Sequence, residues 1–252
     1  MARDPYMPVR RIALQITVER FHALAHDVLF AALLDVNATI REVARYYLRR
    51  TAPMDFAAFY RDALGTGTGN QLLGAIHGIS ETGTAVDAER LLPSASQGSI
   101  RIRKAAIAAI ARLQQGDQYL SLFMKALVHA LPGLSNAGRD ALLDRAYILD
   151  TGCLAELLQT SPYMHVRKNV LRLLARVGKW TSLPYLIRAI CDKDDGIVQM
   201  ATRLLKRWLL SSNRYFVTPT IEQLAEIRGT LEVCQVGLGE EERRQILFAL
   251  NI

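Results

Sequence analysis

The chain has 252 residues, of which half are apolar but only 7% aromatic, a balance that favours helices over sheets. Its 16 Gly and 8 Pro are too few for a disordered or loop-rich chain. The 31 Lys and Arg exceed the 24 Asp and Glu, and the net charge of +7 favours an anionic partner. The cysteines Cys153, Cys191 and Cys234 are far apart and form no C-x-x-C, which argues against a disulfide framework or a zinc site and favours a reducing compartment.

The N-terminal part shows no targeting or membrane segment. Its first residues carry charges without a continuous apolar core or a cleavage site of small residues. The most apolar early stretch, residues 21–36, is interrupted by His22, His26, Asp27 and Asp35, and it is too short and too polar to span a bilayer. We therefore expect a soluble, cytoplasmic protein with no membrane contact.

Segments of similar sequence recur along the chain, and each places a β-branched residue before an arginine at the start of an apolar-periodic helix. They are MPVRRIAL from Met7, ATIREVAR from Ala38, IRIRKAAI from Ile100 and MHVRKNVL from Met164. Their arginines are separated by 31, 62 and 64 residues, which correspond to one, two and two units of about 31 to 32 residues. One more unit reaches DDGIVQMATRLLKRWL, and degenerate copies lie near positions 72 and 135. Seven units at one period predict a repeat architecture.

Each unit is predicted to contain two helices. In chain order, short helices are expected over residues 84–92 and 117–131, each after a helix that ends near a glycine. In the degenerate copy near 135, the apolar spacing predicts one helical face that includes Leu142, Ala146 and Leu149. Beyond the repeats, a helix is expected from Ile221 to about Cys234, followed by GLGEEERRQILFAL.

The clearest pair lies between residues 164 and 191. Val166, Val170, Leu174 and Val177 lie at i, i+4, i+8 and i+11 on one face of a helix that Gly178 ends. A second amphipathic helix is predicted from about residue 181 to 191. Neither helix can bury its apolar face alone, so neighbouring pairs must stack.

These segments resemble HEAT repeats, particularly the bacterial HEAT-like group that includes the phycobilisome-lyase type. The best matches are residues 40–44, 102–106 and 166–178. The resemblance covers roughly residues 5 to 210 and implies an all-α, armadillo-like α-solenoid of about six helix pairs over residues 1–210. We interpret residues 211–252 as a helical C-terminal cap, because the ends of a solenoid need one. The Asp that the family places before Val-Arg is missing before Ile102 and Val166.

Basic residues collect opposite the face that carries the β-branched residue in the second helix of each pair. The four clearest second-helix segments, residues 35–50, 100–113, 164–179 and 196–208, contain sixteen basic residues and only two acidic ones, Asp35 and Glu42. The resemblance implies that second helices line the concave surface, which predicts a basic groove. Ten of these residues, termed the basic stripe, form the candidate partner-binding site: Arg49, Arg50, Lys104, Arg112, Lys168, Arg172, Arg176, Arg203, Lys206 and Arg207.

The stripe has two interpretations at this point. A charged face opposite an apolar face is typical of any solvated helix. A ligand of the stripe, by contrast, would be an acidic protein segment or a nucleic-acid backbone. The arginines directly after the β-branched residues, Arg41, Arg103 and Arg167, are predicted to be structural and to pair with carbonyl groups or acids between repeats.

The sequence predicts no catalytic, metal or cofactor site. His22 and His26 have metal-ligand spacing but no third ligand, and GTGTGN from Gly65 is not followed by Gly-Lys-Ser/Thr. HEAT-like DNA glycosylases need an aromatic residue and a carboxylate in the groove, and neither Trp180 nor Trp208 has an acid beside it on the stripe. We therefore predict a non-enzymatic scaffold for protein–protein interaction, without a cofactor or a small-molecule substrate. A nucleic-acid-binding solenoid is the first alternative, and a DNA glycosylase or lyase is the second.

Overall fold

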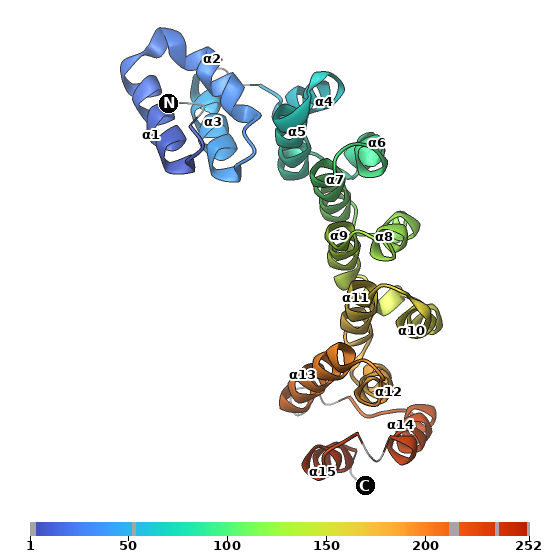
Figure 1. The fold of residues 1–252 in the computed structure, drawn as a ribbon. Coiled ribbons are helices and arrows are strands. Elements are labelled where there is room, and N and C mark those ends of the chain that lie inside the picture. Colours follow the sequence, from blue (N-terminus) through green and yellow to red (C-terminus); the bar gives the residue numbers. More distant parts are fainter. Residues whose placement is uncertain (1–3, 52–53, 212–216, 235–236, 251–252) are drawn as a thin grey trace. The chain divides into compact units, whose positions relative to one another are not determined.

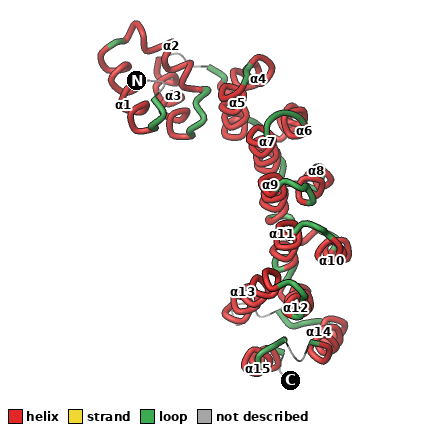
Figure 2. The backbone as a smooth tube through the Cα atoms, in the orientation of Figure 1, coloured by secondary structure: helices red, strands yellow, loops and turns green. Residues whose placement is uncertain are grey.

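The computed structural model describes residues 4–51, 54–211, 217–234 and 237–250, and every regular element in these ranges is a helix (Figures 1 and 2). The prediction of an all-α protein is confirmed. The chain divides into two compact units, residues 1–119 and 120–252. In the described ranges, no helix combines the length and the apolar character that crossing a membrane requires.

The first unit contains two groups of packed helices. Helices α1, α2 and α3 pack on one another, α4 packs on α5, and α5, η1 and α6 pack on α7. The bounds are α1 (Met7–Arg20), α2 (His22–Leu33), α3 (Ala38–Thr51), α4 (Phe56–Thr66), α5 (Gly69–Thr82), the 3-10 helix η1 (Ala85–Leu91), α6 (Leu92–Ser96) and α7 (Ile100–Leu113). The short helix expected over residues 84–92 is thus present, mainly as η1, which begins with a capping box between Thr84 and Asp87.

The second unit is built from helices that pair with their neighbours in the chain. Its elements are α8 (Leu120–Leu127), α9 (Pro132–Leu143), η2 (Ala146–Ile148), α10 (Thr151–Thr160), α11 (Met164–Leu174), α12 (Lys179–Ile190), α13 (Asp195–Ser211), α14 (Ile221–Val233) and α15 (Glu240–Ala249). Helix α8 packs on α9, α10 on α11, and α12 on α13, while α11 also packs on both α9 and α13. Within this unit, Figure 1 shows α9, α11 and α13 following one another, with α8, α10 and α12 beside them. Helix α14 packs on α12 and α15 on α13.

Three sequence predictions about helix length were wrong. The helix expected to continue to Gly178 ends at Leu174, and the backbone N–H of Arg176 bonds to the carbonyl of Leu173 in the turn that follows. The helix expected over residues 117–131 is only α8, because the chain must leave the helical conformation before Pro132, the first residue of α9. Helix α9 ends at Leu143 instead of continuing to Leu149. The buried guanidinium of Arg145 donates a 2.6 Å hydrogen bond to the carbonyl of Ala141, which is the acceptor that the next helical N–H would use. The backbone N–H of Arg145 turns to Leu142 instead.

The β-branched residues of the repeats mostly lie in the core. Ile40, Val166 and Ile197 are buried, as the pattern predicts. Ile102 is only half-buried, and Val9 is 37% exposed, because α1 turns Leu14 rather than Val9 into the core. The apolar periodicity therefore identifies the buried face of α3, α11 and α13, whereas in α1 it does not.

The arginines that follow these β-branched residues connect successive segments, as predicted. Arg167 donates a 2.7 Å hydrogen bond to the carbonyl of Leu158 and pairs with Asp192 at 2.5 Å. Arg41 donates to the carbonyl of Asp35 at 2.6 Å and pairs with Glu81. The same arrangement recurs in the bonds of Arg10 to the Asp4 carbonyl and the Asp35 carboxylate, and in part in the bond of Arg103 to the Ala95 carbonyl.

Two cysteines that are distant in sequence meet at the ends of α12 and α14. The thiol of Cys191 lies 3.8 Å from the carbonyl oxygen of Cys234. Burial, and after it the neighbouring Cys191, raises the pKa of the Cys234 thiol to about 11. Cys153 is exposed, whereas Cys234 is buried.

At pH 8 we expect iodoacetamide to alkylate Cys153 more than about tenfold faster than Cys234, because only the exposed thiolate reacts. Mass spectrometry of digested protein, sampled over time, gives the rate at each cysteine. Similar rates at Cys153 and Cys234 in the folded protein would contradict the placement of Cys234. Denatured protein, in which both thiols are accessible, is the control.

Candidate functional site

The ten residues of the basic stripe are divided between the two units. Four lie on α3 and α7, two lie on α11, three lie on α13, and Arg176 lies in the turn that follows α11. Lys168 and Arg172 are half-buried, and the other eight are exposed. None of the ten forms an ion pair with an acid in the described ranges. The structural arginines Arg10, Arg41 and Arg167 all do.

In the first unit, the four stripe residues are not brought together. The guanidinium of Arg49 lies 5.5 Å from the ring centre of Phe56, and that of Arg50 lies 4.8 Å from the ring centre of Tyr46. Both are in the last turn of α3, where the helix dipole favours cations. Lys104 and Arg112 are exposed on α7, and no contact joins them to the arginines of α3. The interpretation as a solvated face suits this part of the stripe.

In the second unit, a buried asparagine brings two arginines together. The Oδ1 atom of Asn169 accepts hydrogen bonds from Arg139 of α9 and Arg172 of α11, both at 2.9 Å. The amide nitrogen of Asn169 donates to Ser135 at 2.9 Å and to Asn136 at 3.0 Å. Asn169 is only 1% exposed, so its side chain holds both guanidinium groups from the buried side of this surface.

Like charges surround Arg172. Burial, and then the charges of Arg139 and Arg203, lower the pKa of Arg172, and the charge of Asp140 opposes this shift. Asp140 already pairs with Arg139 at 2.7 Å. The cationic side chains of α9, α11 and α13 therefore repel one another at this surface, and an anion placed among them would be stabilised.

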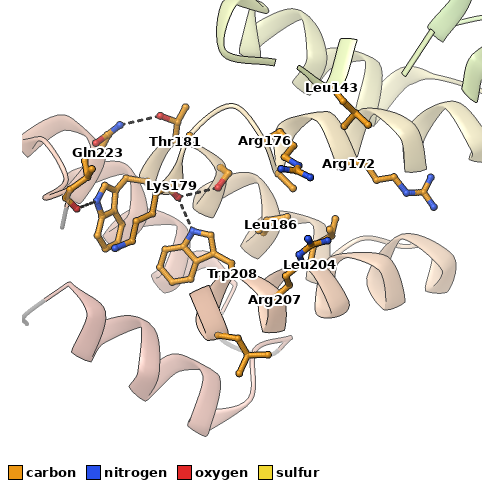
Figure 3. A pocket seen from close by; sticks show the side chains of 16 residues that line it. Leu143, Arg172, Arg176, Lys179, Thr181, Leu186, Leu204, Arg207, Trp208 and Gln223 are labelled. Atoms are coloured by element: carbon orange, nitrogen blue, oxygen red, sulfur yellow. Dashed lines mark hydrogen bonds between the residues drawn. The ribbon is translucent and has the colours of Figure 1, made fainter. Parts of the chain in front are cut away.

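A pocket of about 980 Å³ lies next to these residues, entirely within the second unit (Figure 3). Four cationic side chains line it: Arg172, Arg176, Lys179 and Arg207. No acidic side chain is among the described residues of its lining. Its apolar lining includes Leu143 of α9, Leu186 of α12, and Leu204 and Trp208 of α13.

Two tryptophans form one wall of the pocket. The rings of Trp180 and Trp208 meet edge to face, with their centres 5.6 Å apart. The indole N–H of Trp180 donates to the carbonyl of Val217 at 2.6 Å, and that of Trp208 donates to the carbonyl of Lys179 at 2.8 Å. They are 4% and 8% exposed, so the indoles hold α12, α13 and the segment before α14 together and present little ring surface to a ligand.

Sequence reasoning missed Arg139 and the pocket. The stripe positions were counted from the β-branched residue that precedes an arginine in each repeat. Arg139 lies on α9, in a degenerate repeat without this Val-Arg pair, so the count did not include it. No basic run marks it, because residues 139–145 carry two Arg and two Asp. The pocket depends on residues of α11, α12, α13 and α14 that no single-helix pattern relates.

The other sequence candidates form no site. In the described ranges, no cluster of three or more His, Cys, Asp or Glu side chains could hold a metal ion. The ring of His26 packs against Phe30 at 4.6 Å, while the side chain of His22 lies outside the described residues. The glycine-rich run from Gly65 forms the end of α4 and the start of α5.

Comparison of the chain with models of known protein families and with curated protein sequences finds no match. The geometry of the second unit is therefore the basis on which a function is proposed.

Proposed function

We propose that this protein is a non-enzymatic α-solenoid scaffold of HEAT type that binds an acidic segment of a partner protein. The solenoid consists of about six helix pairs over residues 1–210, closed by a helical cap over residues 211–252. The chain-order packing of α8 to α13 supports this architecture, and so does the packing of α14 and α15 on the last pair. Binding takes place on the stripe residues of α11 and α13.

One observation carries the proposal: Arg172, Arg176 and Arg207, three stripe cations that form no ion pair in the described ranges, line one open pocket together with Lys179. Burial lowers the pKa of Arg172, and the like charges of Arg139 and Arg203 lower it further, an arrangement that a solvated face does not require. Such uncompensated charge costs stability in the free protein, and an acidic ligand removes that cost. Functional surfaces are where proteins retain such electrostatic conflict.

A protein ligand suits the site better than a nucleic acid. Proteins that bind single-stranded nucleic acid stack bases on exposed aromatic rings, whereas Trp180 and Trp208 are buried and their N–H groups are bonded within the protein. A phosphate backbone contacts cations and leaves an apolar pocket unfilled. The described lining also lacks the carboxylate that a glycosylase would need beside a tryptophan.

Charge reversal tests the proposal. In the variant Lys168→Glu, Arg172→Glu, Arg176→Glu, we expect the affinity for labelled poly-glutamate at about 50 mM salt to fall at least about tenfold, because three attractions become repulsions. The matched control reverses three exposed cations elsewhere in the second unit, Lys125, Lys193 and Arg228, and changes the net charge equally. Fluorescence anisotropy measures both affinities.

Equal loss in the stripe variant and in its control would show that only net charge matters, and the stripe would then be a solvated face. Tighter binding of a DNA duplex than of poly-glutamate, with a steep loss of affinity as salt rises, would favour the nucleic-acid alternative.

A further inference from the structure

We infer that the pocket between α11, α12 and α13 binds a large apolar side chain of the partner, and that acidic residues on both sides of this anchor contact Arg172, Arg176 and Arg207. The ligand is thus an extended acidic peptide with an aromatic or leucine anchor. This inference rests on the proposed function and specifies its ligand.

The apolar lining of the pocket provides the first argument. Leu186 is buried at its base and Leu204 is half-buried, so apolar surface continues from the core to the opening. At the rim, Leu210 is 83% exposed and Val217 is 61% exposed. Exposed apolar surface beside a concave site marks a place where a partner is bound. The volume of about 980 Å³ lies at the upper end of the range of roughly 300–1,000 Å³ typical of ligand pockets, which suits several residues of a peptide.

The arrangement of the cations provides the second argument. Arg172 lies in the last turn of α11, Arg176 lies in the turn that follows this helix, and Arg207 comes from α13. The half-buried Leu204 of α13 lines the same pocket as these cations, so apolar surface lies beside them (Figure 3). Guanidinium groups bind carboxylates through two parallel hydrogen bonds, which adds geometric selection to the charge attraction.

The spacing of the helices determines the spacing in the ligand. Packed helices lie about 8–10 Å apart. An extended chain advances about 3.3 Å per residue and its side chains alternate between two faces, so the residues two positions before and two positions after an anchor share its face. Acidic residues at these two positions reach the long cationic side chains on either side of the pocket, while the apolar anchor between them faces the pocket. A phosphate group alone could contact the arginines but would leave the apolar surface of Leu204 and Leu210 in water.

Two labelled peptides test the inference without changing the protein. The first, SGEDEFEDESG, carries a phenylalanine between acidic residues, and the second, SGEDESEDESG, has a serine in its place and the same charge. We expect the wild-type protein to bind the phenylalanine peptide at least about tenfold more tightly, because only that peptide fills the pocket. Fluorescence anisotropy at about 50 mM and 200 mM salt measures both.

Two protein variants test whether the pocket is the part of the protein that distinguishes the phenylalanine peptide from the serine peptide. Leu204→Asn removes apolar surface from the pocket without changing charge, and we expect it to bring the phenylalanine peptide down to the affinity of the serine peptide. Val233→Asn replaces an 85% exposed valine of α14 that does not line the pocket and should leave both affinities unchanged. Circular dichroism checks that each variant is folded.

The outcomes separate this inference from the proposed function. Equal affinities of the wild-type protein for the two peptides, with both lost on reversal of the stripe charges, would overturn the anchor and leave the acidic-partner function intact. No binding of either peptide at low salt would overturn both. Retained discrimination in folded Leu204→Asn would place the anchor elsewhere and also contradict the inference.

Discussion

Replacing Glu81 with Ala is expected to lower the free energy of unfolding by about 3–5 kcal/mol, the effect of removing one partner from a buried ion pair. Glu81 accepts hydrogen bonds from Arg41 and, at 2.7 Å, from Arg45, which also donates to the hydroxyl of Tyr60 at 3.1 Å. Arg41 is only 2% exposed. Without the carboxylate, two buried guanidinium groups of α3 would lose their charge partner.

Urea unfolding of the full chain, with hydrogen exchange of α3 to α5 as a local probe, measures this loss. Glu42→Ala on α3, the helix of Arg41 and Arg45, is the control, because Glu42 is exposed and should change stability by less than about 0.5 kcal/mol. A loss below about 1 kcal/mol in Glu81→Ala would mean that the network contributes no more than a surface ion pair does.

The pKa of Glu81 also predicts how the free energy of unfolding depends on pH. Burial raises the pKa of Glu81, but the hydrogen bonds from Arg41 and Arg45 outweigh burial and hold the pKa below its ordinary value of 4.5. The contribution of Glu81 is therefore present above pH 4.5 and lost as the pH falls through the lower, folded-state pKa. Wild-type protein should lose more stability between pH 5 and pH 3 than Glu81→Ala, and parallel curves would contradict this assignment.

Two glycine-to-alanine substitutions in the second unit are expected to have opposite effects. A Cβ atom at Gly138 of α9 would lie 2.3 Å from the backbone nitrogen of Leu127 and 2.7 Å from the carbonyl oxygen of Phe123. Because these are backbone atoms of α8, the helices must separate, and we expect Gly138→Ala to cost about 3 kcal/mol. Gly229 of α14 has nothing within 4 Å of such a Cβ, so Gly229→Ala should stabilise the protein by about 1 kcal/mol.

Thermal and urea unfolding of the two variants provide the comparison. Each variant adds one methyl group within a helix, so the contrast isolates the close approach of α8 and α9 from helix propensity. Stabilisation by Gly138→Ala would show that these helices pack less closely than the structure indicates.

Much of the local structure could be predicted from single-helix patterns. Apolar residues at i, i+4 and i+8 define one face of a helix wherever the helix packs, and this predicted the buried positions of Ile40, Val166 and Ile197. The structural role of Arg41 and Arg167 could be predicted as well, because an arginine beside the buried face must find an acceptor. Where a backbone carbonyl has a competing donor, as at Ala141 with Arg145, the pattern failed to predict the helix end.

The candidate site could be predicted only in part. The charge on α11 and α13 was visible because it lies opposite an apolar face, a property of each helix alone. The same rule selected Arg49 and Arg50, which lie on aromatic rings of the first unit and join no cluster. Arg139 was passed over, since its role comes from the Asn169 side chain of another helix.

The sequence by itself determined the helical class, the buried faces and the excess of positive charge, because these follow from the order of residues along a single helix. Only the tertiary structure decided which cations share a surface and that apolar surface opens beside them. Contacts among α9, α11, α12 and α13 depend on how side chains from different repeats pack, and residue spacing along the chain does not encode those distances.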